Sequence, residues 1–376
     1  MPYDVPHAVS PGLWTLAWKR LRADRVAMVS LAIVVAFLVM VVLSATGVIA
    51  KDWAKEVGVN YAPPSFLGPA EPAAGAAIAP APATVSDEPT ELPIEDPLAG
   101  ALAAIKNEGA AAPKAAEGGN ATEGQSVDPL ADVMAEIKSK GVTNATAEVR
   151  APTLPLGGDK WGRDVLKKVI KGSQTSIIVG LASACVATLL GTVFGALAGY
   201  YGKWIDDFFN WFYSVFTSIP YLLLILAVAA VLQQKGVLTI VLILGLTGWT
   251  GTFRLIRGEY LKHKGREYVQ AADAIGASNS RRMFVHIFPN VSHVVLVQLS
   301  IFTVAFIKSE VILSFLGFGV PVDVVSWGSM LNEAQNELIL GKWWQLAAAG
   351  TAMAVLVTAF SLFTDALRDA LDPKLK

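Results

Sequence analysis

Long apolar stretches without charge alternate with shorter polar segments along the chain. Six windows contain no Asp, Glu, Lys or Arg: residues 26–50, 172–202, 208–234, 236–253, 287–307 and 343–364. A helix that crosses a hydrocarbon core of about 30 Å needs about 20 residues. Five windows reach that length, and 236–253 lies at its short end. The pattern predicts an all-α membrane protein with six transmembrane helices.

Composition supports this class. Hydrophobic residues make up 53% of the 376 residues and charged residues 16%, whereas a soluble domain is about a quarter charged. A soluble enzyme is therefore excluded. The first window exceeds the 7–15 apolar residues of a cleavable signal core, so we expect an uncleaved anchor. The single cysteine, Cys185, cannot form a disulfide within the chain.

Basic residues predict the topology. They gather in three segments, at 19–25, at 257–282 and in the C-terminal tail. Six spans put all three segments on one side, which the positive-inside rule assigns to the cytoplasm. We therefore expect a cytoplasmic segment at 1–25, a first transmembrane helix at 26–50, and both termini in the cytoplasm. A fourth basic group falls outside, where we expect an amphipathic segment at the outer interface: Lys160, Arg163, Lys167, Lys168 and Lys171.

Residues 51–155 differ from the rest and predict a long, largely irregular extracytoplasmic insertion. Between residues 60 and 148 there are 13 acidic residues and 4 lysines, and nine prolines lie between 61 and 100. Residues 96–109 and 128–141 form a repeat with 8 of 14 identical positions. In each, Asp-Pro begins and Gly ends a short helix. The two helices are either a gate, plug or docking element for an outer partner, or tethered helices without such a role.

Small residues and a proline stand out inside the spans. Gly191, Gly195 and Gly199 are four residues apart, a spacing that lets another helix approach closely. The other helix belongs to this chain or to another subunit. Pro220 interrupts the third window, frees the carbonyl of Phe216 and bends the helix. The bend either lines a translocation path or serves packing.

The fifth span contains two charges near its outer boundary. Lys308 and Glu310 are two residues apart, about 200° around a helix, so they cannot pair with each other. One of them reaches the interface and the other faces the bundle. Glu310 is the better candidate for the path, with an interface residue as the alternative. The sequence contains no P-loop and no metal-ligand pairing among its four histidines.

The polar segment at about 258–290 carries the most specific pattern. A short amphipathic helix begins at Glu267 and presents small residues, Ala271 and Ala272. Gly276 ends this helix, and a second helix runs to Pro289, where the fifth span begins. The first helix either docks in a cleft of a partner or belongs to an ordinary basic loop near anionic lipid.

This segment resembles the docking loop of ABC-importer permeases. Ala271, Ala272, Gly276 and Pro289 match that loop in spacing, while Gln270 replaces its glutamate. Other stretches resemble the dipeptide, oligopeptide and nickel branch, and the N-terminal arrangement is similar to the second of its two permeases. These stretches include residues 156–166, 195–202, 218–220, 313–319, 326–328 and 365–373.

The resemblance implies a permease core at 156–376 with five transmembrane helices and an ATPase-docking loop at about 258–290. It implies a subunit that, with a second permease, forms a path for di- or oligopeptides or a related small solute across the bacterial inner membrane. Other partners would be two P-loop ATPase subunits, which hold ATP and Mg, and an extracytoplasmic solute-binding protein. The chain itself would be no enzyme and would bind no cofactor, metal or nucleic acid. Expected docking residues are Glu267, Gln270, Ala271, Ala272, Asp273, Gly276 and Pro289.

Two other functions remain open at this point. The chain could be the permease of an ABC-type peptide exporter, for which the absence of a solute-binding protein would argue. It could instead be a membrane-anchored interaction protein that acts through the repeat helices outside the membrane. Deletion of the repeats would then abolish function and Gly276 would be dispensable.

Overall fold

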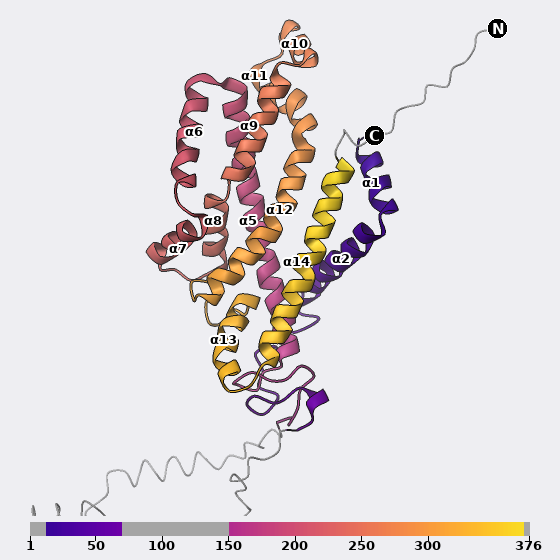
Figure 1. Cartoon of the computed structure of the whole chain (residues 1–376), viewed down its shortest axis with the longest axis vertical. Coiled ribbons are helices and arrows are strands. Elements are labelled where there is room, and N and C mark those ends of the chain that lie inside the picture. Colours follow the sequence, from indigo (N-terminus) through magenta and orange to yellow (C-terminus); the bar gives the residue numbers. More distant parts are fainter. Residues whose placement is uncertain (1–12, 70–149, 372–376) are drawn as a thin grey trace, which may run out of the picture. The chain divides into compact units, whose positions relative to one another are not determined.

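The structure is a computed structural model that describes residues 13–69 and 150–371. The described residues form helices and irregular segments, with a few isolated backbone bridges and no strand. The helices, drawn in Figure 1, are α1 (Leu13–Ala23), α2 (Arg25–Ala45), η1 (Ser65–Leu67), α5 (Val165–Tyr201), α6 (Lys203–Thr217), α7 (Tyr221–Leu232), α8 (Val237–Thr247), α9 (Thr250–Lys264), α10 (Glu267–Ala274), α11 (Asn279–Arg281), η2 (Arg282–Ile287), α12 (Phe288–Phe315), α13 (Trp327–Ile339) and α14 (Trp344–Leu371).

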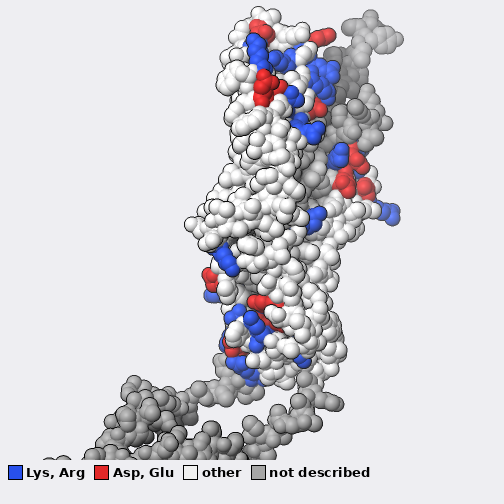
Figure 2. Space-filling view, turned by 60° about the vertical axis from the view of Figure 1, so that its left-hand side comes forward, with Lys and Arg blue, Asp and Glu red and all other residues white. Residues whose placement is uncertain are grey.

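The all-helical membrane class is confirmed. Four helical stretches are long and apolar enough to cross a membrane, and the number reaches six if two bent pairs, α6 with α7 and α8 with α9, each count as one span. The repeat helices at 96–109 and 128–141 lie outside the described residues. In Figure 2 charged side chains gather toward the two ends of the molecule, with mostly uncharged surface between them. We call these the α10 end and the α13 end.

Helix α5 is the centre of the bundle and packs against α2, α8, α9 and α12. Its 37 residues span about 55 Å, so it extends well beyond a 30 Å hydrocarbon core. Gly191, Gly195 and Gly199 face α9. A Cβ atom on Gly195 would lie 2.7 Å from the carbonyl oxygen of Phe253, and one on Gly199 would lie 2.7 Å from that of Arg257. The backbone of α9 therefore passes directly over this glycine row.

The chain breaks between α6 and α7, which meet at 85°. Pro220 immediately precedes α7 in an extended conformation. The helix before it ends in an aromatic cluster, in which the rings of Phe216 and Trp249 are 5.5 Å apart. A proline cannot donate the hydrogen bond that would continue α6, so the bend follows from the sequence.

Helices α2 and α14 pack beside each other, and α1 packs against α14. The carboxylate of Asp24 caps α2 by accepting hydrogen bonds from the amides of Val26 and Ala27. Ala17 and Leu21 of α1 are buried with Ala370 and Leu371 at the end of α14. Figure 1 shows that α1 and the end of α14 lie toward the α10 end.

The two ends of the predicted insertion are ordered and lie together. Residues 51–69 and 150–164 are joined by backbone bridges between Glu56 and Arg163, Gly58 and Ala151, and Pro64 and Leu154. Gly162 has φ +77° and leaves no room for a Cβ atom beside the carbonyl of Gly58. These segments form a folded base at the α13 end.

Candidate functional site

Helix α10 has one buried face and one exposed face. Val269 and Ala272 are buried, and Val269 packs in a cluster with Met283 and Ile287 of η2. Gln270 and Ala271, among others on the opposite side, are exposed. The expectation that Ala272 is presented with Ala271 is therefore wrong, because Ala272 packs toward the bundle and only Ala271 of the two lies on the exposed face.

Gly276 ends α10 with φ +82°, a conformation that favours glycine. Its amide donates to the carbonyl of Asp273 at 2.8 Å, and the amide of Ala277 donates to that of Ala272 at 2.9 Å. A Cβ atom on Gly276 would meet nothing within 4 Å. Ile275 beside it is 85% exposed. The turn therefore projects from the bundle.

An ion pair joins α10 to the segment that leads into α12. The guanidinium of Arg282 lies 2.5 Å from the carboxylate of Asp273 and also faces the ring of Tyr200. The residues Arg282–Ile287 form a π-helical stretch that continues into α12, and Pro289 occupies the first turn of α12. Arg282 therefore links α10 directly to the π-helical stretch that continues into α12.

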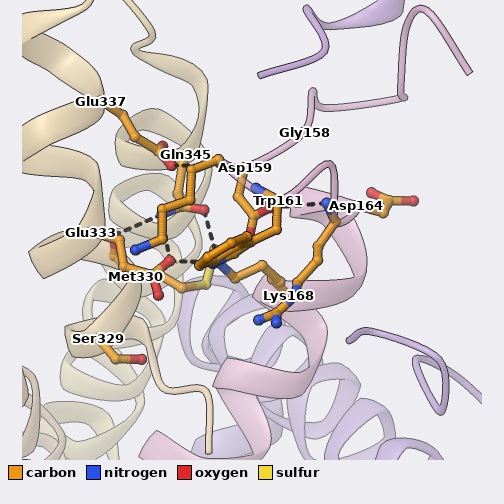
Figure 3. Close-up of polar contacts among 12 residues, drawn as sticks. Gly158, Asp159, Trp161, Asp164, Lys168, Ser329, Met330, Glu333, Glu337 and Gln345 are labelled. Atoms are coloured by element: carbon orange, nitrogen blue, oxygen red, sulfur yellow. Dashed lines mark hydrogen bonds and ion pairs between the residues drawn. The ribbon is translucent and has the colours of Figure 1, made fainter. Parts of the chain in front are cut away.

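The α13 end contains a buried polar network around Lys168, shown in Figure 3. The side chain of Lys168 is 2% exposed. Its ammonium group lies 2.8 Å from the carboxylate of Asp159, 2.7 Å from that of Glu333 and 3.1 Å from the amide oxygen of Gln345. Lys168 is therefore not part of an exposed amphipathic surface, as was expected for this basic group. Its charge is neutralised inside the protein by groups from α13 and the loop before α5.

The same loop is folded by its own polar groups. The other carboxylate oxygen of Asp159 accepts hydrogen bonds from the amides of Trp161 and Arg163, both at 2.9 Å. Asp164 caps α5 through the amide of Leu166. The loop is also pinned from α14, because the indole of Trp344 donates to the carbonyl of Gly158 at 2.8 Å.

Glu337 of α13 adds a titratable group to this region. One carboxylate oxygen accepts from the amide of Lys160 at 3.3 Å, and the other is buried without a partner among the described residues. Burial raises the pKa of Glu337 to about 7, opposed by the positive charge of Lys168. This carboxyl therefore changes protonation near neutral pH.

The two charges of the fifth span separate as their spacing requires. Lys308 is exposed and Glu310 is fully buried. The carboxylate of Glu310 accepts hydrogen bonds from Ser176 of α5 at 2.6 Å and Ser314 of α12 at 2.7 Å. The hydroxyl of Ser176 in turn accepts from the amide of Trp327 at 3.3 Å. Glu310 thus ties α5, α12 and α13 together, and its role in a translocation path stays a prediction.

Of the other path candidates, Pro220 is exposed at the bend and Phe216 is partly buried beside it. The expected docking residues lie on α10, in the turn after it and at the start of α12. In the described part of the chain no group of three or more His, Cys, Asp or Glu side chains is placed to hold a metal ion. No sequence pattern indicated the partners of Lys168, since Glu333 and Gln345 are 165 and 177 residues away.

The fold defines a multi-pass helical protein with four to six stretches that could cross a membrane. Residues 191–376 match the family model of the binding-protein-dependent transport system inner membrane component. Residues 12–64 match the N-terminal transmembrane domain of oligopeptide transport permease C.

Curated relatives agree with these matches. The chain is 36% identical over 220 residues to the dipeptide transport system permease protein DppC of Bacillus subtilis, covering 58% of this chain and 68% of the relative. It is 35% identical over 220 residues to the oligopeptide transport system permease protein OppC of the same species, covering 58% and 72%. It is 34% identical over 223 residues to the glutathione transport system permease protein GsiD of Pectobacterium atrosepticum, covering 59% and 73%. The chain belongs to the family of binding-protein-dependent transport system inner membrane components and is a permease of the ABC-importer class.

Proposed function

We propose that this chain is one of two permease subunits of an ATP-driven importer of peptides across a bacterial inner membrane. The complex would also contain a second permease, two P-loop ATPase subunits and an extracytoplasmic solute-binding protein. The observation that carries the proposal is the match to peptide permeases over the core, together with the exposed face of α10 around Gln270 and Ala271.

In this proposal the α10 end lies in the cytoplasm. Its basic side chains support that orientation by the positive-inside rule, including Arg254, Lys262, Lys264, Arg266 and Arg281. The N- and C-terminal segments then lie in the cytoplasm as well, because α1 and the end of α14 lie toward the same end. The α13 end faces the solute-binding protein.

Transport would follow from alternating access. ATP closes the ATPase pair, and α10 moves with the ATPase surface on which it docks. The pair of Asp273 and Arg282 and the continuous stretch into α12 carry that motion to the spans. The driving force is the different affinity of the complex for nucleotide in its two states. Glu267, Gln270 and Ala271 would contact the ATPase, with Gln270 hydrogen bonding where the related loops carry a charge.

The solute would pass between the two permeases. Helix α6 has no buried residue, and Trp204, Phe208 and Trp211 are large exposed side chains on it. An apolar face of this kind fits a second permease or the bilayer. The bend at Pro220 follows directly after α6. This position supports the assignment of Pro220 to the side of the subunit that lines the translocation path.

The proposal is tested by purifying the tagged chain from its native membrane in mild detergent and identifying its partners by mass spectrometry. The importer predicts a second permease and two P-loop ATPases, and ATP-dependent peptide uptake once the complex and its binding protein are reconstituted. Recovery of the chain alone, or with outer proteins only, would contradict it. No observation on the described residues favours the exporter or the interaction protein.

A further inference from the structure

A cavity of about 240 Å³ opens at the α13 end, close to the Lys168 network. Its walls come from parts of the chain that are distant in sequence: the outer loops, the start of α5, the α7–α8 connection, the end of α12 and α13. Among its lining residues are Trp53, Lys160, Arg163, Lys235, Asn332 and Glu333. The cavity is smaller than the 300–1,000 Å³ of a typical small-molecule site, so it suits one end of a peptide rather than a whole oligopeptide.

The lining has an excess of positive charge. It contains Lys160, Arg163, Lys168 and Lys235 against the single acid Glu333. Glu333 is already paired with Lys168, as is Asp159. The remaining three cations have no ion pair among the described residues.

Other acids near the cavity do not compensate these cations. Asp52 pairs with Lys167 at 2.7 Å, and Glu56 pairs with Arg150 at 2.6 Å. Asp323 lies in the loop between α12 and α13 but does not line the cavity. The acids that this end provides are therefore either committed to other cations or outside the cavity wall.

Arg163 is the best placed of the three cations. Its guanidinium lies over the ring of Trp53, 5.7 Å from the ring centre, which limits its freedom. Its Nε atom is buried without a hydrogen-bond partner among the described residues. An arginine held in this way retains donors for a planar anion and binds carboxylates through two parallel hydrogen bonds.

The neutral polar groups of the wall are already in use. The hydroxyl of Ser329 donates to the carbonyl of Ser326 at 3.0 Å and accepts from its amide at 2.9 Å. The amide of Asn332 donates to the carbonyl of Phe315 at 2.6 Å, and the hydroxyl of Ser314 donates to Glu310. The groups that the cavity offers a ligand in excess are cationic donors, which favour an anion.

We propose that this cavity binds the C-terminal carboxylate of the incoming peptide, with Arg163 as its main partner and Lys160 and Lys235 in support. The inference rests on the proposed function, because it assumes a peptide solute and an outer position of the α13 end. The carboxylate is the one anionic group that every unmodified peptide shares, whatever its side chains. Recognition of that group lets a permease hold peptides of different sequence at its entrance.

The test uses the complete importer with its binding protein, reconstituted in liposomes. Uptake of labelled alanine peptides of two to five residues is measured as free acids and as C-terminal amides. The variant Arg163→Gln keeps the backbone amide that bonds to Asp159 and removes the guanidinium that lies over Trp53. The matched control is Arg150→Gln, which removes an exposed arginine at the same end that does not line the cavity.

Hydrogen bonds to charged groups contribute about 1.5–3 kcal/mol, so Arg163→Gln should lower uptake of the free acids by about 10-fold or more. Uptake of the amides should stay unchanged, as should all uptake by Arg150→Gln. Lys235→Gln, at an exposed position, should lower uptake of the free acids by a smaller factor, again without effect on the amides.

Two results would overturn the inference itself. Unchanged uptake of the free acids by Arg163→Gln would show that the cavity does not bind them. An equal loss for acids and amides would indicate that Arg163 contacts an acidic group of the binding protein or supports the fold. If the unchanged importer takes up no peptide at all, the proposed function fails first, which is a separate outcome.

Discussion

Asp273 and Arg282 lie on two different helical segments of the α10 end, and their side chains form an ion pair of 2.5 Å. Asp273 is the last acid of α10, and Arg282 begins the π-helical stretch that becomes α12. The carboxylate is 64% exposed, so the pair contributes little to stability, about 0–1 kcal/mol. Its position instead suits the transfer of motion between docking helix and span.

Asp273→Asn is therefore expected to lower transport per ATP hydrolysed while leaving thermal stability within about 1 kcal/mol of the unchanged protein. The ratio of peptide uptake to phosphate release in liposomes measures this coupling. The double variant Asp273→Arg with Arg282→Asp restores the ion pair with its charges exchanged. It should recover part of the ratio of peptide uptake to phosphate release. Equal coupling in the unchanged protein and Asp273→Asn would exclude this route.

Lys168 should be essential for stability. Lys168→Met leaves Asp159 buried without its cation, and breaking a buried pair in this way costs about 3–5 kcal/mol. Thermal unfolding in detergent should show a large fall in the midpoint. Lys167→Met is the matched control, since Lys167 is partly exposed and pairs with the exposed Asp52, and it should cost less than about 1 kcal/mol. Similar midpoints for the two variants would contradict the network.

Glu337 should make stability depend on pH. Its pKa of about 7 in the folded chain lies above the roughly 4.3 of an exposed glutamate, so the folded state holds the proton more tightly. The resulting stabilisation is present below about pH 4.3 and is lost as the pH rises toward 7. The side chain of the variant Glu337→Gln cannot ionise, so this loss of stability with rising pH is absent from it.

Thermal midpoints of Glu337→Gln and the unchanged protein, measured from pH 5 to 8, test this expectation. The variant should gain on the unchanged protein as the pH rises. Asp323→Asn, at an exposed position in the preceding loop, should show no such trend. A difference that is the same at every pH would contradict the assignment.

The glycine row of α5 should tolerate no side chain. A Cβ atom at Gly195 would lie 2.7 Å from the carbonyl of Phe253, so Gly195→Ala forces α5 and α9 apart at a cost of about 1–3 kcal/mol. Gly258 of α9 has open space, and Gly258→Ala should be neutral or stabilise by up to about 1 kcal/mol. Thermal unfolding that ranks the two variants equally would contradict this packing.

The apolar windows were sufficient to predict the helical class, and Pro220 was sufficient to predict the position of a bend. Both features could be predicted because they depend on residues that are close together in the sequence. The segment that begins at Glu267 and ends at Gly276 also predicted the short helix α10. The Lys168 network could not be predicted in the same way. Its partners come from α13 and α14, and only tertiary packing brings Glu333 and Gln345 to the start of α5.

The basic group before α5 shows the same limit. In the sequence, this group is an exception to the rule that basic residues gather on the cytoplasmic side. The sequence alone does not reveal which of its lysines are buried. In the structure Lys168 is enclosed by acids and Lys167 is paired with Asp52, so neither acts as a free positive charge. These basic residues are therefore weaker evidence against the cytoplasmic assignment of the other basic segments than their number suggests.

We propose that the exposed face of α10 docks on an ATPase, and two substitutions at one position distinguish docking from its absence. Ala271 is exposed on that face, so neither Ala271→Ser nor Ala271→Trp disturbs the buried contacts of α10. The tagged variants are purified from native membranes and the P-loop ATPase that accompanies each is quantified. The account predicts normal recovery with Ala271→Ser and loss of the ATPase with Ala271→Trp. Full ATPase recovery with Ala271→Trp would contradict it.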